Sequence, residues 1–347
     1  MKEYGYFQPA EWVPHKACWL AWPSDKELWL ENLNHAQREF TDLCHAIADL
    51  DPKTGSSRGE TLNILVRTQE DETLAKSALK ALSATFHKIP YGDIWLRDTA
   101  PIFLMNRKNQ LASACFQFNG WGEKYVLPYD ADLAHTIAKK LGVQQFSLPW
   151  ILEGGSLDVD GEGSCLTTKQ CLLNPNRNPE MGLSEIEQRL RDDLGIEKVL
   201  WLNEGLLNDH TDGHIDTLAR FVEPGVVVCM YAKEPENDPN TKILNEIIKD
   251  LESFTDAKGR RLKVIKVPSP GKLVDEEGKI MPGSYMNFYI ANTTVVVPTY
   301  GSRFDDEAVK QISSLFPTRK TVGLSARFIL SGGGAFHCIT QQVPKGG

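Results

Sequence analysis

The chain of 347 residues is 41% hydrophobic and 24% charged, a composition that suits a globular protein with a sizeable core. Its net charge of -8, from 46 acidic and 38 basic residues, disfavours nucleic acid or an anionic membrane as a partner and is compatible with a cationic substrate. No apolar run approaches the roughly 18 residues of a membrane span, and residues 1–12 lack the apolar stretch of a secretory signal. We therefore expect a cytoplasmic protein.

Segments with helical periodicity alternate with short β-branched or aromatic runs along the whole chain. The helical windows begin near Leu28, Gln69, Tyr129, Ser184, Asn240 and Asp305. The first window places one apolar stripe on its predicted helix, formed by Trp29, Leu33, Ala36, Phe40, Leu43 and Ile47. Strands are predicted at 61–67, 111–118, 225–231, 261–267 and 292–298.

Turn and cap residues mark several boundaries. Ser184 followed by Glu187 predicts a capping box, and Asp160-Gly161 and Glu223-Pro224-Gly225 predict hairpins. The polar residues 52–60 predict a mobile loop. The predicted helices start roughly 40 to 65 residues apart, which indicates a repeated α/β module. No segment has the composition of an interdomain linker, so residues 1–347 are expected to form a single catalytic domain.

The seven cysteines are odd in number and irregularly spaced, which favours reduced thiols over a disulfide framework. No CxxC pair offers the spacing of a structural zinc site. Cys18, Cys115 and Cys229 each lie within an apolar run and are expected to be buried structural thiols.

Two segments place a carboxylate beside apolar or glycine residues. In residues 92–103, Asp98 follows an apolar stretch, where it either pairs with its neighbour Arg97 or waits for a cationic ligand. In residues 152–163, Glu153 precedes two glycines that permit close backbone packing, although a solvent-exposed turn glutamate is the better interpretation of this segment alone.

Residues 208–221 concentrate histidine and aspartate before an apolar run. In extended geometry His214 and Asp216 point to the same face, which suits a general acid/base beside a substrate anchor. His210 and His214 are also spaced like two zinc ligands on a helix. Gly213 and the β-like residues that follow argue against such a helix, so no metal site is expected here.

The last chemically rich segment, residues 329–344, holds three glycines followed by His337 and Cys338. The glycines allow backbone and ligand to approach closely, so Cys338 is interpreted as an accessible nucleophile and not as a core thiol.

Together these segments resemble the motifs of the agmatine deiminases, a family of the guanidino-group-modifying superfamily. The matching motifs are Trp95-Leu96-Arg97-Asp98, Glu153-Gly154-Gly155, Gly213-His214-Ile215-Asp216, and Gly332-Gly333-Gly334 with His337-Cys338-Ile339-Thr340-Gln341-Gln342-Val343-Pro344. Residues 8–23 are similar as well, so the resemblance spans nearly the whole chain. A related bacterial group, the peptidylarginine deiminases, shares these motifs.

The resemblance implies an α/β fold, the five-bladed pseudo-symmetric propeller called a pentein, in which ββαβ modules surround a polar tunnel. It implies that Cys338 attacks a guanidinium carbon, that His214 is the general acid/base, and that Glu153 orients this histidine. Asp98 and Asp216 would hold the guanidinium, and Trp95 would line the tunnel. No metal and no organic cofactor are expected.

One position departs from the family. Agmatine deiminases of the plant type have a glutamate four residues before the catalytic histidine, where it helps to receive the distal amine of the substrate. Here that residue is His210, with Asp209 and Asp212 nearby, so the roles of these three residues stay open.

The expected partner is therefore a small cationic guanidino substrate, agmatine, with arginine in peptides as the alternative. A metal-dependent hydrolase is a further alternative. A non-catalytic binding module is disfavoured because all five polar residues of the motifs are present. The sequence leaves open whether the chain forms a homo-oligomer.

Overall fold

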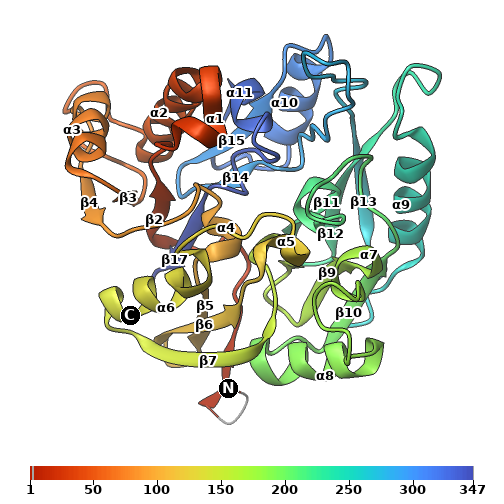
Figure 1. Ribbon diagram of the computed structural model, residues 1–347. Coiled ribbons are helices and arrows are strands. Elements are labelled where there is room, and N and C mark those ends of the chain that lie inside the picture. Colours follow the sequence, from red (N-terminus) through yellow and green to blue (C-terminus); the bar gives the residue numbers. More distant parts are fainter. Residues whose placement is uncertain (2–3, 347) are drawn as a thin grey trace.

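The structure, a computed structural model, describes residues 1 and 4–346 and contains five small sheets arranged in a ring (Figure 1). The chain passes round this ring in sequence order, as the colours of Figure 1 show. In each sheet an antiparallel pair of strands is followed by a helix and then by a parallel strand. The expected α/β propeller of ββαβ modules is therefore confirmed.

Three sheets follow one another along the chain. The first contains β1 (Tyr6–Phe7), β5 (Ile102–Asn106), β6 (Leu111–Gln117) and β7 (Gln144–Ile151). The second contains β8 (Asp158–Val159), β9 (Ser164–Thr168) and β10 (Lys198–Leu202), and the third β11 (Ala219–Glu223), β12 (Val226–Tyr231) and β13 (Lys263–Pro268). Their crossover helices are α6 (Asp130–Leu141), α8 (Leu183–Leu194) and α9 (Thr241–Ser253).

The fourth sheet contains β14 (Tyr289–Ile290), β15 (Thr294–Thr299) and β16 (Lys320–Ser325), with α10 (Asp305–Ser313) as its crossover helix. The fifth combines both ends of the described chain: β17 (Gln341–Pro344), β2 (His15–Ala21), β3 (Thr61–Val66) and β4 (Ala84–Lys88), with α2 (Leu33–Ala48) and α3 (Gln69–Ala78). Because β17 pairs antiparallel with β2, this sheet closes the ring.

Short helical turns occupy the connections between these elements. They are α1 (Lys26–Trp29), η2 (Leu30–Asn32), α4 (Leu96–Thr99), α5 (Gly120–Glu123), η3 (Gly154–Ser156), α7 (Lys169–Leu172), η4 (Ile215–Thr217) and α11 (Arg327–Leu330). The long crossover helices lie at the periphery of the ring in Figure 1. None of the helices in the described part of the chain is both long and apolar enough to span a membrane.

The predicted helices are confirmed with adjusted starts. In α2, the predicted stripe is buried at Ala36, Phe40, Leu43 and Ile47. The first window is nevertheless interrupted, because Leu30 adopts a positive φ of 47° that ends α1 before α2 begins. The predicted strands and both hairpins are present as well.

One local prediction was wrong. Ser184 does not cap α8, whose N-cap is Gly182 with no side-chain hydrogen bond; the capping box of this chain lies instead at Thr68 and Asp71 of α3. The predicted mobile loop is exposed over residues 52–58, but its last residue, Glu60, is buried. Its carboxylate accepts hydrogen bonds from the Tyr289 hydroxyl (2.7 Å) and the Asn292 amide (2.9 Å), which tie the loop to the fourth sheet.

All seven cysteines are buried free thiols, as the irregular spacing predicted. Burial raises the pKa of Cys18, Cys115 and Cys229, which is the behaviour of structural thiols that stay protonated.

Candidate active site

A cavity of about 210 Å³ brings residues from distant parts of the chain together. Asp98 and Cys338 lie in its wall, and aromatic side chains form much of the rest: Trp29, Trp95, Trp121 and Tyr125. The predicted position of Trp95 in the wall of a tunnel is thus matched by a position in the wall of this cavity.

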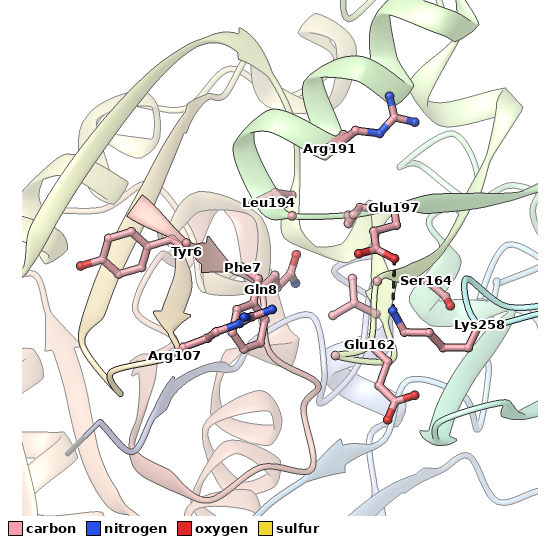
Figure 2. A pocket seen from close by; sticks show the side chains of 16 residues that line it. Tyr6, Phe7, Gln8, Arg107, Glu162, Ser164, Arg191, Leu194, Glu197 and Lys258 are labelled. Atoms are coloured by element: carbon pink, nitrogen blue, oxygen red, sulfur yellow. Dashed lines mark hydrogen bonds and ion pairs between the residues drawn. The ribbon is translucent and has the colours of Figure 1, made fainter. Parts of the chain in front are cut away.

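A larger hollow of about 890 Å³ lies elsewhere, against β1 and the C-terminal end of α8 (Figure 2). Its lining contains neither cysteine nor histidine, and its Lys258 is ion-paired with Glu197 at 3.2 Å. This hollow therefore offers neither a thiol nor an imidazole, and the smaller cavity is the better candidate for chemistry.

The polar residues of the site occupy equivalent places in the five sheets. We call the segment just before the first antiparallel strand of each sheet its lead segment. The lead segments before β5, β8, β11, β14 and β17 carry Asp98, Glu153, Asp216, Asn287 and Cys338, respectively. The ring repeats one position five times, and the chain fills it with four kinds of polar side chain, aspartate occurring twice.

Cys338 is held by an asparagine that the sequence had not indicated. Its Sγ accepts a hydrogen bond from Nδ2 of Asn287 (3.1 Å), while Oδ1 of Asn287 accepts from the backbone amides of His337 and Cys338. The Cys338 side chain is 7% exposed and lines the cavity, so the thiol is reachable by a small molecule. The role of Cys338 as a nucleophile stays a prediction.

Asp98 is buried but does not pair with Arg97, so the structural alternative for this residue was wrong. Its carboxylate accepts hydrogen bonds from Trp121 Nε1 (2.9 Å) and from the Gly155 amide (2.8 Å). Arg97 instead donates to Gln341 (2.9 Å) and lies 3.8 Å from Glu11. Asp98 is thereby left free of any Lys or Arg partner within the described residues.

Gly155 explains why the glycines of the second motif are needed. A Cβ atom at this position would lie 2.6 Å from His214 Nδ1, 2.9 Å from Asp98 Oδ1 and 3.1 Å from Asp216 Oδ2. Three polar side chains therefore converge on a point that only a residue without a side chain can occupy.

Asp216 forms the other side of the site. Its Oδ2 lies 2.7 Å from Nδ1 of His337 and accepts a hydrogen bond from the Cys338 thiol at 3.5 Å. The second ring nitrogen of His337, Nε2, lies 2.7 Å from Glu11 Oε2. The same oxygen of Glu11 is ion-paired with the buried Arg220 at 2.8 Å. Asp216 Oδ1 has no hydrogen-bond partner, so this oxygen is available to a ligand.

His214 and Glu153 are buried, with 1% and 0% exposure, so the interpretation of Glu153 as an exposed turn residue was wrong. His214 begins the 3-10 turn η4 and is not part of a strand; β11 starts at Ala219. Its Nδ1 lies 3.8 Å from Asp98 Oδ2. Glu153 is held by Arg177, whose Nε donates to it at 2.8 Å.

Burial and neighbouring charges shift the pKa values of the ionisable groups in the site. Burial, followed by the carboxylates of Asp216 and Asp98, raises the pKa of Cys338 well above that of a free thiol. Burial also raises the pKa of Asp98. For His214 burial acts in the lowering direction, but Asp98, Cys171 and Glu153 outweigh it and raise the pKa well above the usual value. Without a ligand, the site therefore holds a neutral thiol and favours a protonated imidazole.

This arrangement predicts how Cys338 reacts in the free protein. A raised pKa leaves little thiolate at neutral pH, so alkylation by iodoacetamide should be slow there and should accelerate as the pH rises beyond about 9. Asp98→Asn removes a negative neighbour, so it should speed alkylation at pH 8 by about tenfold, the effect of one pKa unit. Mass spectrometry of the Cys338 peptide measures both rates; a wild-type thiol that reaches half-maximal reactivity below about pH 7 would contradict the prediction.

The outer part of the cavity is built around tryptophans. The Asp93 carboxylate accepts hydrogen bonds from Nε1 of Trp29 (2.9 Å) and Trp95 (2.8 Å), and the two rings are stacked with centroids 6.1 Å apart. A Cβ at Gly332 would lie within 2.9 Å of both indoles, so the glycine loop packs directly on them.

Of the three residues left open near His214, only His210 lines the cavity. Asp209 accepts hydrogen bonds from Thr211, and Asp212 is ion-paired with Lys124 (2.7 Å) and with Arg177. His210 and His214 do not form a metal-binding group; within the described residues the group with suitable geometry is Glu153, Cys171 and His214.

Comparison with known proteins identifies the family of the chain. Residues 7–344 match the family described as Porphyromonas-type peptidyl-arginine deiminase. A Legionella pneumophila protein with the provisional name agmatine deiminase is 40% identical over 347 residues, covering 99% of this chain and 96% of that relative.

Solved structures are similar over the same span. The agmatine deiminase of Enterococcus faecalis, described as catalysing its reaction, has a TM-score of 0.90 at 34% identity and covers 99% of this chain and 97% of its own. A C. jejuni agmatine deiminase with substrate bound has a TM-score of 0.87 at 27% identity, covering 98% and 97%. Because the family match and these similarities extend over almost the whole chain, this protein belongs to the Porphyromonas-type peptidyl-arginine deiminase family.

Proposed function

We propose that the protein is an agmatine deiminase, which hydrolyses the guanidinium group of agmatine to N-carbamoylputrescine and ammonia. One observation carries this proposal: a cavity thiol, Cys338, faces two buried carboxylates, Asp98 and Asp216, that lack a Lys or Arg partner among the described residues. Buried carboxylates without a cation are costly, and a planar guanidinium with forked N–H groups would satisfy both.

Binding of the substrate also supplies the charge that the nucleophile needs. The guanidinium stays protonated at physiological pH and would neutralise the two carboxylates that raise the pKa of Cys338. The thiol would then lose its proton more readily, and its thiolate would lie beside the electrophilic carbon. Asn287, which already donates to Sγ, would keep the sulfur in this direction.

Attack of the sulfur on the guanidinium carbon forms a C–S bond and a tetrahedral adduct. His214, whose raised pKa favours the imidazolium, donates a proton to a terminal nitrogen, and the C–N bond breaks to release ammonia. An amidino group remains on Cys338. Glu153 would stabilise and orient the imidazolium, since its carboxylate and the His214 ring lie within 4.8 Å of each other.

Water completes the cycle. The neutral His214 takes a proton from a water molecule, the hydroxide adds to the amidino carbon, and the C–S bond breaks to release the ureido product and the thiol. The proton that Cys338 loses passes to solvent and converts the released ammonia to ammonium, whereas the other proton transfers use His214, and the steps require no metal or organic cofactor.

The shape of the cavity favours a small substrate over arginine in a peptide. Its volume of about 210 Å³ suits one extended guanidino compound, and the stacked Trp29 and Trp95 with the glycine loop narrow its outer part. A peptide would need an open groove for the backbone that continues from its arginine. Agmatine is therefore preferred, and peptidyl-arginine is the second candidate because the family takes its description from it.

Ammonia release across a panel of guanidino compounds tests this choice. Agmatine is expected to have a kcat/KM at least about 100-fold above that of a C-terminal-arginine peptide, because a misfitted backbone costs several kcal/mol. Free arginine and agmatine analogues with longer or shorter chains complete the panel. If the peptide is the better substrate, the protein is a peptidylarginine deiminase and the assignment to agmatine is wrong.

A further inference from the structure

Next to the substrate carboxylates lies a second cluster of ligand-type atoms. A carboxylate oxygen of Glu153, the Sγ of Cys171 and a ring nitrogen of His214 all lie within 4.8 Å of one another. Donor atoms around a tetrahedral zinc ion lie about 3–4 Å apart, given bond lengths of about 2.0–2.3 Å. Small side-chain movements would therefore bring these three atoms to ligand distance.

The cluster has lone pairs that nothing in the described chain satisfies. Glu153 Oε2 and both ring nitrogens of His214 are buried and lack hydrogen-bond partners. Glu153 is fixed from its other side, because Oε1 accepts from Arg177 at 2.8 Å. Buried polar atoms without partners are rare in folded proteins because each one costs free energy. A bound ion would satisfy Glu153 Oε2 and one ring nitrogen of His214 together.

Neighbouring residues hold the cluster in place. The Thr168 hydroxyl donates to the Gly213 carbonyl (2.7 Å) and accepts from the Cys171 amide (3.2 Å), which fixes α7 against the residue before His214. Gln170 reinforces this contact, because its side chain accepts from the Gly205 amide at 2.7 Å. Cys171 itself is fully buried, so its thiol is held beside the imidazole and not in solvent.

The charge balance also permits a cation. The nearest positive side chain, Arg177, is already shared between Glu153 and Asp212 and donates to the Thr211 carbonyl. Asp98 lies 3.8 Å from His214 and has no cationic side chain of its own. A hydrated ion in the cavity would be drawn towards these carboxylates by the same attraction as a guanidinium.

We propose that Glu153, Cys171 and His214 form an inhibitory binding site for a soft divalent metal ion, of which Zn²⁺ is the best match. Thiolate, imidazole and carboxylate are ligands that zinc accepts, and the fourth position would hold water. Binding exchanges the Cys171 S–H bond for an S–Zn bond and one N–H bond of the protonated His214 for an N–Zn bond, and both protons are released to solvent. The bound ion occupies the lone pair of His214 and repels the guanidinium, so it stops the reaction.

Metal binding is measured first without any reference to activity. Cys338→Ser removes the cavity thiol, and this variant is titrated with Co²⁺, a zinc substitute whose thiolate complexes absorb light. One equivalent of Co²⁺ with a thiolate charge-transfer band is expected, and Zn²⁺ should displace it. Adding Cys171→Ala should weaken binding at least about 100-fold, since even indirect ligand contacts account for about 10–100-fold. Adding Cys229→Ala, a matched loss of a buried thiol in β12, should change nothing.

Activity then tests the inhibition, which rests on the proposed role of His214. Zn²⁺ should abolish ammonia release by the wild type and a chelator should restore it, whereas the activity that Cys171→Ala retains should not fall when Zn²⁺ is added. Absence of a thiolate–Co²⁺ band in Cys338→Ser, or full Zn²⁺ sensitivity of Cys171→Ala, would overturn the proposal. A protein that binds Co²⁺ as expected but releases no ammonia from any guanidino compound would refute the proposed function and leave the metal site standing.

Discussion

Cys338→Ala is expected to lower ammonia release from agmatine by about 10⁴-fold or more, because the variant cannot form the amidino-thioether. Losses of this size follow the removal of a nucleophile, whereas a lost packing contact costs far less. The same protein should still bind agmatine, since Asp98 and Asp216 remain in place. Equilibrium dialysis and a coupled ammonia assay measure the two properties separately.

The control for this experiment is Cys229→Ala, which removes an equally buried thiol from β12. It should retain wild-type turnover if it folds. Acid quenching of the wild type during turnover should add the mass of one amidino group to the Cys338 peptide. Substantial activity in Cys338→Ala would show that another group attacks the substrate, and the mechanism would have to be abandoned.

Asp98→Asn is expected to lower kcat/KM for agmatine by about 10²–10³-fold. The substitution removes one of the two buried charges that face the guanidinium, and truncating a buried charge pair costs about 2–5 kcal/mol. The carboxylate also supports the imidazolium of His214, 3.8 Å away, so both binding and proton donation should suffer. Steady-state kinetics with agmatine measures the combined loss.

Asp193→Asn provides a matched control, because Asp193 of α8 is also a buried carboxylate that accepts a hydrogen bond from a tryptophan, Trp150 Nε1, at 2.9 Å. It does not line the cavity. Each variant replaces one oxygen of a carboxylate that accepts a hydrogen bond from a tryptophan. If losing such an oxygen lowered activity merely by disturbing the fold, kcat/KM would fall in both variants. If the two variants have equal kcat/KM values, Asp98 is not part of the substrate site.

The crossover helices could be predicted from the sequence because each must bury one continuous apolar stripe, as α2 does. Four of the five predicted strands, β3, β6, β12 and β15, were equally readable, since their mostly buried residues form short apolar blocks. Strands such as β4 and β16 were missed because they are only half-buried and mix polar with apolar residues without clear alternation. The closure of the ring by β17 and β2 is a long-range pairing that no local pattern encodes.

The candidate site was likewise predicted only in part. Asp98, Glu153, His214, Asp216 and Cys338 stand in dense motifs, and the structure brings them together. Asn287 was missed because its neighbours in the sequence do not form a motif rich in glycine or charged residues. The module repeat could have indicated it, because the fourth module was the one to which no polar site residue had been assigned. Arg177 and Trp121 orient site carboxylates from connecting segments, and only the folded ring reveals their contacts.

The pairing of β17 with β2 has a consequence for synthesis of the protein on the ribosome. Cys338 lies just before β17. Asp98 and Asp216, the carboxylates proposed to hold the substrate cation, are synthesised more than a hundred residues earlier. A nascent chain whose β17 is still inside the exit tunnel can therefore assemble most of the ring without a positioned sulfur. The Cys338 thiol should become reactive towards the substrate only after β17 has emerged and paired with β2. A polypeptide that stalls or terminates before this point would therefore be inactive.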